Sequence, residues 1–147
     1  MCRYGYHHWA VGPSALKAPI GWFTPHALST KEVYSTIDDF VRCAELAKEA
    51  GYDGVEIMGS EGYLINQFIV SKTNKRTDEF GGSYENRTRL PIEVVRRTRQ
   101  AVGKDFIIVY RLSMLDLVDD GSSWEEIVSL AKQIEQVLFH SLDQKPA

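Results

Sequence analysis

The sequence predicts an α/β fold with parallel strands, and three observations lead to this prediction. An amphipathic helical pattern over residues 29–51 runs directly into a short apolar strand, "YDGVEIM". The same kind of joint recurs later in the chain, where "EAGYDGVEIM" is matched by "AVGKDFIIVY". The second strand is apolar at consecutive positions, which is typical of strands covered on both faces. A repeated βα unit with right-handed crossovers fits either a doubly wound sheet or a (β/α)8 barrel, and spacing does not separate the two.

The first helix has clear signals at both ends. Ser29 is expected at the N-cap, with Glu32 three residues on to complete a capping box, and Gly51 is expected just past the helix end. Between them the apolar residues form one stripe, as an amphipathic helix requires. The stripe consists of Val33, Ile37, Phe40, Val41, Ala44 and Ala47.

Two further helices are predicted. One runs from about Ser83 to Val102, and Pro91 inside it should kink the first turns or restart the helix. The other begins at Ser122 or Ser123, each of which has a glutamate three residues on. Its predicted apolar face is Trp124, Ile127, Val128, Ala131, Ile134 and Leu138.

Composition and charge exclude several classes of function. The net charge of −3 over 147 residues gives no reason to expect a nucleic-acid partner. Cys2 and Cys43 lie far apart, and His7 and His8 have no third ligand at a fitting spacing, so no metal site is predicted. We find no apolar run long enough to span a membrane and no secretory signal pattern, and we therefore expect a cytoplasmic protein.

The residues that follow the two strands are the candidates for chemistry, because ligands in both α/β folds bind at the carboxyl ends of strands. Glu61 and Tyr63 follow the first strand, and Arg111 ends the second. A phenol held near an acid can donate a proton to a developing carbanion, and an arginine suits a site where negative charge accumulates. Each residue also has a structural alternative. Glu61 could cap a helix starting near residue 62, Tyr63 could be a packing aromatic, and Arg111 could form a salt bridge with Glu56.

Two other patterns favour a structural interpretation. The segment 71–89 is rich in Lys and Arg, but acidic residues are interleaved with them, and "GGS" is typical of a tight turn that delivers Ser83 as an N-cap. The stretch "GSEG" after the first strand lacks the G-x-G-x-x-G spacing of a dinucleotide site.

The stretches "GYDGVEIMGSEGYLINQF" and "NKRTDEFGGSYENRTRLPIEVVRRTRQAVGKDFIIVYRLS" resemble the central part of the old yellow enzyme family of flavin barrels. The hallmark of that family is a strand that runs into a turn with G-Y-L, followed by N-x-R-x-D-x-[YFW]-G-G-S-x-E-N-R. The versions "MGSEGYLIN" and "YRLSMLDLV" are most similar to the bacterial 2,4-dienoyl-CoA reductases of fatty acid β-oxidation. The resemblance covers about residues 3 to 136, starting at "RYGYHHWAVGPSALKAPI".

The resemblance implies a role for each candidate. Tyr63 matches the tyrosine that protonates the substrate carbon after hydride arrives from reduced FMN, and Glu61 stands where other members carry an active-site histidine. Arg111 matches the arginine beside the flavin pyrimidine ring. The implied reaction is the reduction of an enoyl-CoA thioester with NADPH as reductant.

The resemblance also implies a partial TIM (β/α)8 barrel of about two βα units, namely the fourth and fifth strands with a preceding helix. We expect an irregular loop segment over 1–28, a partial FMN-barrel domain over 29–139 and a divergent tail over 140–147. Because the other strands, the flavin phosphate site and the iron–sulfur and FAD/NADPH regions have no counterpart, we expect a fragment that is inactive by itself. The alternatives are a non-catalytic half-barrel that self-associates through its strand edges, and a fragment of another oxidoreductase of the same family.

Overall fold

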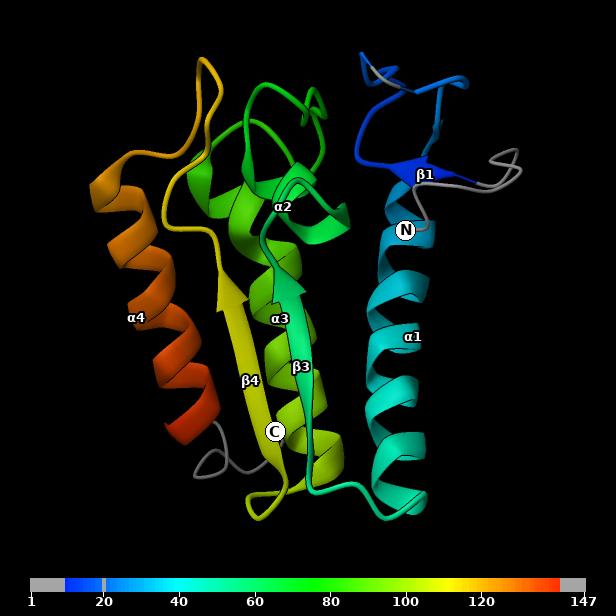
Figure 1. Ribbon diagram of the computed structural model, residues 1–147, viewed down its shortest axis with the longest axis vertical. Helices are drawn as coiled ribbons and strands as arrows, with labels where there is room; N and C mark the ends of the chain where they lie inside the picture. The colour runs from blue at the N-terminus through cyan, green and yellow to red at the C-terminus, as the bar shows by residue number, and fades with distance from the viewer. Residues whose placement is uncertain (1–9, 20, 141–147) are drawn as a thin grey trace.

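The computed structural model describes residues 10–19 and 21–140, and it shows a two-stranded parallel sheet with helices packed along one side (Figure 1). The elements follow in the order β1 (Val11–Gly12), β2 (His26–Ala27), α1 (Thr30–Glu49), β3 (Gly54–Gly59), α2 (Leu64–Ile69), α3 (Tyr84–Val102), β4 (Ile107–Leu112) and α4 (Trp124–His140). The predicted α/β class is confirmed.

Strands β3 and β4 form the sheet that carries the candidate residues. They pair in parallel, in a register that runs from Gly54 opposite Ile107 to Gly59 opposite Leu112. Because the strands are parallel and in register, their carboxyl ends lie at the same edge of the sheet. The short strands β1 and β2 form a separate parallel pair within the segment that we expected to be irregular.

The helix starts follow the capping signals in the sequence. In α1 the Glu32 backbone N–H donates to Ser29 Oγ at 3.3 Å, and the Ser29 backbone N–H donates to the Glu32 carboxylate at 2.7 Å, so the predicted capping box is confirmed. The Ser29 hydroxyl also donates to the Glu32 carboxylate at 2.7 Å, and this bond, together with the one from the Ser29 backbone N–H, lowers the pKa of Glu32 to about 2. Ser83 caps α3 as predicted, and Ser123 rather than Ser122 forms the reciprocal bonds at α4, with Glu126.

The expectation that Pro91 restarts the helix is wrong. Helix α3 runs without interruption through Pro91, although a proline there removes one backbone donor. Its neighbours Leu90, Val94 and Val95 are completely buried, and burying a side chain of this kind contributes roughly 1.5–3 kcal/mol. Packing therefore outweighs the local cost of the proline.

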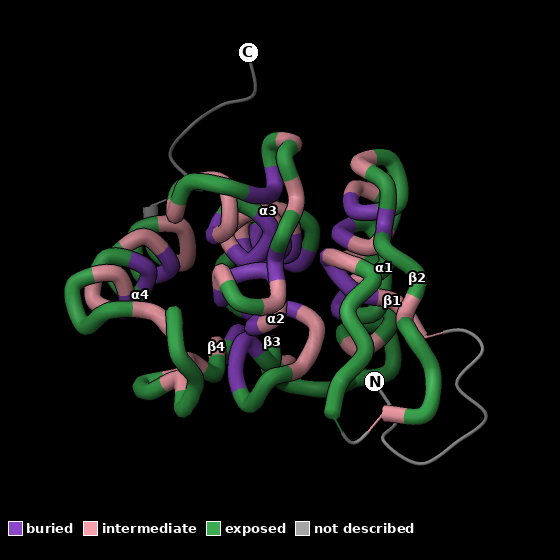
Figure 2. Tube along the Cα trace, turned by 90° about the horizontal axis from the view of Figure 1, so that it is seen from above, coloured by how far each residue is buried: buried purple, intermediate pink, exposed green. Residues whose placement is uncertain are grey.

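The core lies between the sheet and the helices. Figure 2 shows the buried residues gathered on α3 and on the parts of α1 and α4 that pack near it. On α4 the predicted stripe is only partly right. Ile127 and Ile134 are buried, but Trp124, at 60% exposure, and Ala131 are exposed, whereas Leu130, which was not predicted, is buried at 2% exposure. The principal core residues are Val33, Ile37, Ile57, Phe68, Phe80, Val94, Val95, Ile108, Leu130 and Ile134.

The two faces of the sheet differ. Ile57 and Ile108 point into the core, whereas Met58, Ile107 and Val109 alternate with them and are exposed. The expectation that β4 is covered on both faces is therefore wrong for this chain, since the part that the structure describes supplies helices for one face alone (Figure 1). We call the exposed side the open face, made up of Glu56, Met58, Ile107, Val109 and Arg111.

The covered face is very tightly packed where β3 ends. A Cβ atom at Gly59 would lie 2.1 Å from the Tyr110 hydroxyl oxygen, so no side chain fits there unless Tyr110 moves. Tyr110 is deeply enclosed, and this burial raises the pKa of its hydroxyl. Within the described ranges, none of the helices has both the length and the apolar character that crossing a membrane requires.

Candidate functional site

The turn that follows β3 has an unusual backbone. The Tyr63 backbone N–H donates to the Ser60 carbonyl at 3.3 Å, and the two residues between them, Glu61 and Gly62, have φ values of 64° and 71°. Two successive positive φ values are the requirement of a type I′ turn. Glycine adopts this conformation freely, but for Glu61 it costs on the order of 1–2 kcal/mol. A strained residue thus stands where the sequence predicts an active-site acid.

The first turn of α2 holds this turn in place. The Gly62 backbone N–H donates to Asn66 Oδ1 at 2.8 Å, and Gln67 Nε2 donates to the Gly62 carbonyl at 2.6 Å. Tyr63 is the N-cap residue of α2 and is half-buried. Glu61 lies outside the helix, so the alternative in which it caps a helix starting near residue 62 is wrong.

Arg111 lies on the open face near the end of β4, opposite Met58. Its Nη1 lies 3.0 Å from Glu61 Oε1, and its Nη2 lies 2.8 Å from Glu56 Oε1. The hydrogen bond with Glu61, together with the charge of Glu56, raises the pKa of Arg111. The predicted alternative, a salt bridge with Glu56, is thus present, and it coexists with the contact to Glu61.

Two of the three predicted site residues are therefore in direct contact. Glu61 and Arg111 are 50 residues apart in the sequence and meet because the parallel strands end at one edge. Tyr63 follows Glu61 by two positions and begins α2 on the same side of the molecule. Its role as a proton donor, like the roles of the other two residues, stays a prediction.

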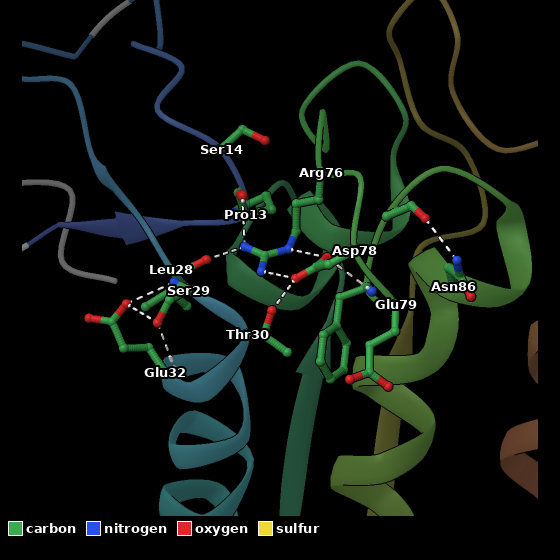
Figure 3. A network of polar contacts seen from close by, with 12 residues as sticks. Pro13, Ser14, Leu28, Ser29, Thr30, Glu32, Arg76, Asp78, Glu79 and Asn86 are labelled. Carbon is green, nitrogen blue, oxygen red and sulfur yellow. Dashed lines mark hydrogen bonds and ion pairs between the residues drawn. The ribbon is translucent and has the colours of Figure 1, made fainter.

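The basic segment 71–89 is a structural element, as its interleaved charges predict. Figure 3 shows Arg76 reaching from this segment to the carbonyl groups of Pro13 and Leu28 and to the carboxylate of Asp78. Thr30 at the start of α1 also donates to Asp78, at 2.6 Å. We call Arg76, Asp78 and Thr30, with these two carbonyl groups, the Arg76 network. It joins the N-terminal segment, α1 and the loop before α3.

The other arginines of this segment are used in the same way. Arg87 donates to the carbonyl groups of Ile69 and Gly82, both at 2.7 Å, and Arg89 donates to the Glu79 carbonyl at 2.9 Å. These bonds hold the loop before α3 in place, which agrees with a structural role for the segment. His7 and His8 lie outside the described residues, so the expectation that they bind no metal stays a prediction.

A polar cluster that we did not predict lies behind the sheet, next to the turn. Its members are Asn66, Ser113, Asp116 and Ser122, and they border a cavity of about 10 Å³, which is about the room of one water molecule. In the sequence, the only indication of this cluster is Asn66 in the first turn of α2. Asparagine side chains are usually exposed, so its burial was not expected.

Comparison with known proteins decides the family. The sequence profile of the NADH:flavin oxidoreductase / NADH oxidase family matches residues 5–145. The chain belongs to this family. The match runs further toward the C-terminus than the motifs of the sequence analysis, which end near residue 136.

Relatives and solved structures support this membership. The chain is 40% identical to an NADH oxidase of Thermoanaerobacter brockii over 132 residues, which are 90% of this chain and 20% of the oxidase. A structure of 2-naphthoyl-CoA reductase with 2-naphthoyl-CoA aligns with a TM-score of 0.84 and 37% identity, over 90% of this chain and 20% of the reductase. An old yellow enzyme homologue from Zymomonas mobilis aligns with a TM-score of 0.79 and 34% identity, over 89% of this chain and 40% of the homologue. The chain thus spans a fifth to two fifths of the length of these three proteins.

Membership in this flavin oxidoreductase family implies FMN as cofactor and a nicotinamide nucleotide as reductant. Arg111 fits one contact with a flat, electron-rich ring, because it is charged, half-exposed and carried on the open face at the carboxyl edge. The small cavity behind the sheet is far too small for a flavin. Because it carries Arg111 at the carboxyl edge, the open face is a side on which the described residues could meet the cofactor.

Proposed function

We propose that this chain is the part of an FMN-dependent alkene reductase that supplies two adjacent strand ends of the catalytic barrel. In this proposal β3 and β4 are the fourth and fifth strands of a (β/α)8 barrel, and the open face looks into the barrel. The observation that carries the proposal is the contact of Glu61 with Arg111 at 3.0 Å, which brings the turn after one strand to the end of the next. Active sites of such barrels are built from residues at the carboxyl ends of strands.

Each residue has one task in this proposal. FMN, when bound and reduced by the nicotinamide nucleotide, would supply the hydride that is added to one carbon of the substrate double bond. The Tyr63 hydroxyl donates the proton to the neighbouring carbon, so that the alkene gains two hydrogen atoms. Arg111 places a permanent positive charge where electron density accumulates, and Glu61 holds the guanidinium in position through its hydrogen bond.

The proposed substrate is an enoyl thioester of the 2,4-dienoyl-CoA type, with NADPH as the source of electrons. The similarity to a reductase that was solved with a CoA thioester supports this substrate class. The stretches "MGSEGYLIN" and "YRLSMLDLV" support it independently. A cytoplasmic location accompanies this proposal.

A graft into a longer relative tests the proposal. The segment of this chain that matches the Thermoanaerobacter brockii NADH oxidase would replace its counterpart there, and flavin absorbance would show that the chimera is assembled. We expect NADPH-dependent reduction of a 2,4-dienoyl thioester. An assembled chimera that oxidises NADPH but leaves every conjugated thioester unreduced would contradict the proposal.

Tyr63→Phe in the same chimera tests the proton donor. We expect the oxidation of reduced flavin by the alkene to slow by about 10²–10⁴-fold, because general acid catalysis contributes an effect of that size. Reduction of the flavin by NADPH should stay unchanged, since no substrate proton is transferred in that step. Equal rates for tyrosine and phenylalanine would remove Tyr63 from this role.

A second candidate function rests on the open face. Among the described residues, β3 and β4 pair only with each other, and Met58, Ile107 and Val109 on them are exposed. Both features favour self-association, which would make the isolated chain a non-catalytic oligomer. Light scattering of the purified chain distinguishes the two candidates when it is combined with FMN titration. A soluble, discrete dimer that binds no flavin supports the second candidate. A monomer or an aggregate speaks against it, and tight stoichiometric flavin binding by the isolated chain would contradict the expectation that the fragment is inactive by itself.

A further inference from the structure

We propose that Asn66 is the positioning residue for Tyr63, because its side-chain amide ties the Tyr63 turn to the loop that follows β4. The proposal rests on the proposed function for the importance of Tyr63, but its geometry is independent of flavin and substrate. Asn66 belongs to α2, is only 5% exposed, and has both ends of its amide in use.

The first contact fixes the turn. Asn66 Oδ1 accepts the Gly62 backbone N–H at 2.8 Å, and Gly62 is the residue directly before Tyr63. Since Glu61 and Gly62 both have positive φ, the turn needs an external restraint to keep this conformation. The bond to Asn66 supplies it and thereby sets the direction in which the backbone enters Tyr63.

The second contact reaches the neighbouring strand end. Asn66 Nδ2 donates to Asp116 Oδ1 at 3.1 Å. Asp116 also accepts from Ser113 Oγ at 3.1 Å and from the Ser122 backbone N–H at 3.2 Å, so the loop after β4 is folded around its carboxylate. One amide therefore joins the turn after β3 to the loop after β4.

The two contacts require an amide and fix its orientation. The oxygen must face the Gly62 N–H, and the NH₂ group must face the Asp116 carboxylate. An aspartate at position 66 could accept from Gly62, but its second oxygen would then face another carboxylate at about the same distance, which is unfavourable for two charges. Exchanging the two groups, with aspartate at 66 and asparagine at 116, restores one donor and one acceptor across the contact.

This exchange gives the experiment, which uses the full chain and NMR. The four proteins are the parent, Asn66→Asp, Asp116→Asn and the double exchange Asn66→Asp/Asp116→Asn. The measurements are the hydrogen-exchange rate of the Gly62 amide and the ring resonances of Tyr63. We expect Gly62 exchange to rise by roughly tenfold in Asn66→Asp, because repulsion from the Asp116 carboxylate displaces residue 66 and weakens its contact with the Gly62 N–H by about the strength of one ordinary hydrogen bond. The Tyr63 ring resonances should shift with it, and the double exchange should return both toward the parent values.

Asn86→Asp is the matched control. Like Asn66, Asn86 is an asparagine in the first turn of a helix, and its side-chain amide donates to a loop carbonyl, that of Gly81, at 3.0 Å. This substitution should leave Gly62 exchange and the Tyr63 ring unchanged. If Asn66→Asp does not fold, Asp116→Asn alone decides, because it alters the same contact from the loop after β4. A changed exchange rate of the Gly62 amide then supports the proposal, and an unchanged rate contradicts it.

Parent-like Gly62 exchange and Tyr63 resonances in a folded Asn66→Asp protein would overturn the proposal, and so would a double exchange that restores neither. Neither of these NMR measurements requires the protein to be catalytically active. Failure of the proposed function would appear instead as an unaffected Tyr63→Phe chimera, so the two failures are distinguishable.

Discussion

Arg76 and Arg111 both pair with carboxylates near the carboxyl edge of the sheet, yet their surroundings differ. The Arg76 side chain is 8% exposed, and its guanidinium also binds the carbonyls of Pro13 and Leu28. The Arg111 side chain is 45% exposed and contacts two carboxylates, Glu56 and Glu61, which are themselves exposed. An arginine that saturates buried carbonyls is a structural element, whereas one held by exposed acids on an open face remains available to a ligand.

The comparison predicts its largest effect at Arg76. Arg76→Met should lower the free energy of unfolding by about 3 kcal/mol, because it leaves Asp78 and two backbone carbonyls without their donor. Urea denaturation measures this loss. The interpretation of Arg76 as structural fails if the variant is as stable as the parent.

Arg111 should behave differently under the same substitution. Arg111→Met should change the free energy of unfolding by less than about 1 kcal/mol, since exposed ion pairs contribute little. In the chimera, however, the same change should slow flavin-dependent turnover. A stability loss equal to that of Arg76→Met would erase the distinction between the two arginines.

The pH dependence of the free energy of unfolding should also distinguish the Arg76 network from the contacts of Arg111. Hydrogen bonds from Arg76 lower the pKa of Asp78 from 3.8 to about 2. Because the folded-state pKa is the lower one, the Asp78 carboxylate stabilises the fold fully above about pH 3.8, and this contribution is lost as the pH falls toward 2. Asp78→Asn should therefore be less stable near neutral pH and should lose less stability between those two values. Chemical denaturation at a series of pH values measures it, and a slope identical to that of the parent would contradict the assignment.

A further prediction concerns the strained turn. Glu61→Gly and Glu61→Ala both remove the contact with Arg111, but only glycine relieves the positive φ of 64°. We expect the glycine variant to be more stable than the alanine variant by about 1 kcal/mol. Thermal unfolding of the pair measures the difference. Equal stability would mean that the backbone at residue 61 carries no strain.

The sequence predicts the elements well because their signals are local. The capping box of Ser29 and Glu32, the Ser83 cap and the repeated helix-to-strand joints each lie within a few residues, and all are confirmed. The meeting of Glu61 with Arg111 was also predictable in outline, since parallel strands end at one edge.

The remainder depends on side-chain contacts between residues that are distant in the sequence. No pattern in the sequence shows that Arg76 binds the Leu28 carbonyl or that Asn66 meets Asp116. The open face escaped prediction for a different reason. The apolar residues of β4 suit a strand covered on both sides, and what would cover the second side does not belong to the described residues.

The close approach of Gly59 to Tyr110 has an evolutionary consequence. The phenol of Tyr110 occupies the space in which a side chain at position 59 would stand, 2.1 Å from its first carbon. The two positions should therefore covary among homologues: glycine at the first should accompany a large aromatic at the second, and alanine or serine at the first should accompany a smaller partner. A side chain at position 59 alone would have to displace the Tyr110 phenol next to the turn that begins at Ser60, whereas a smaller residue at position 110 alone would leave a gap there.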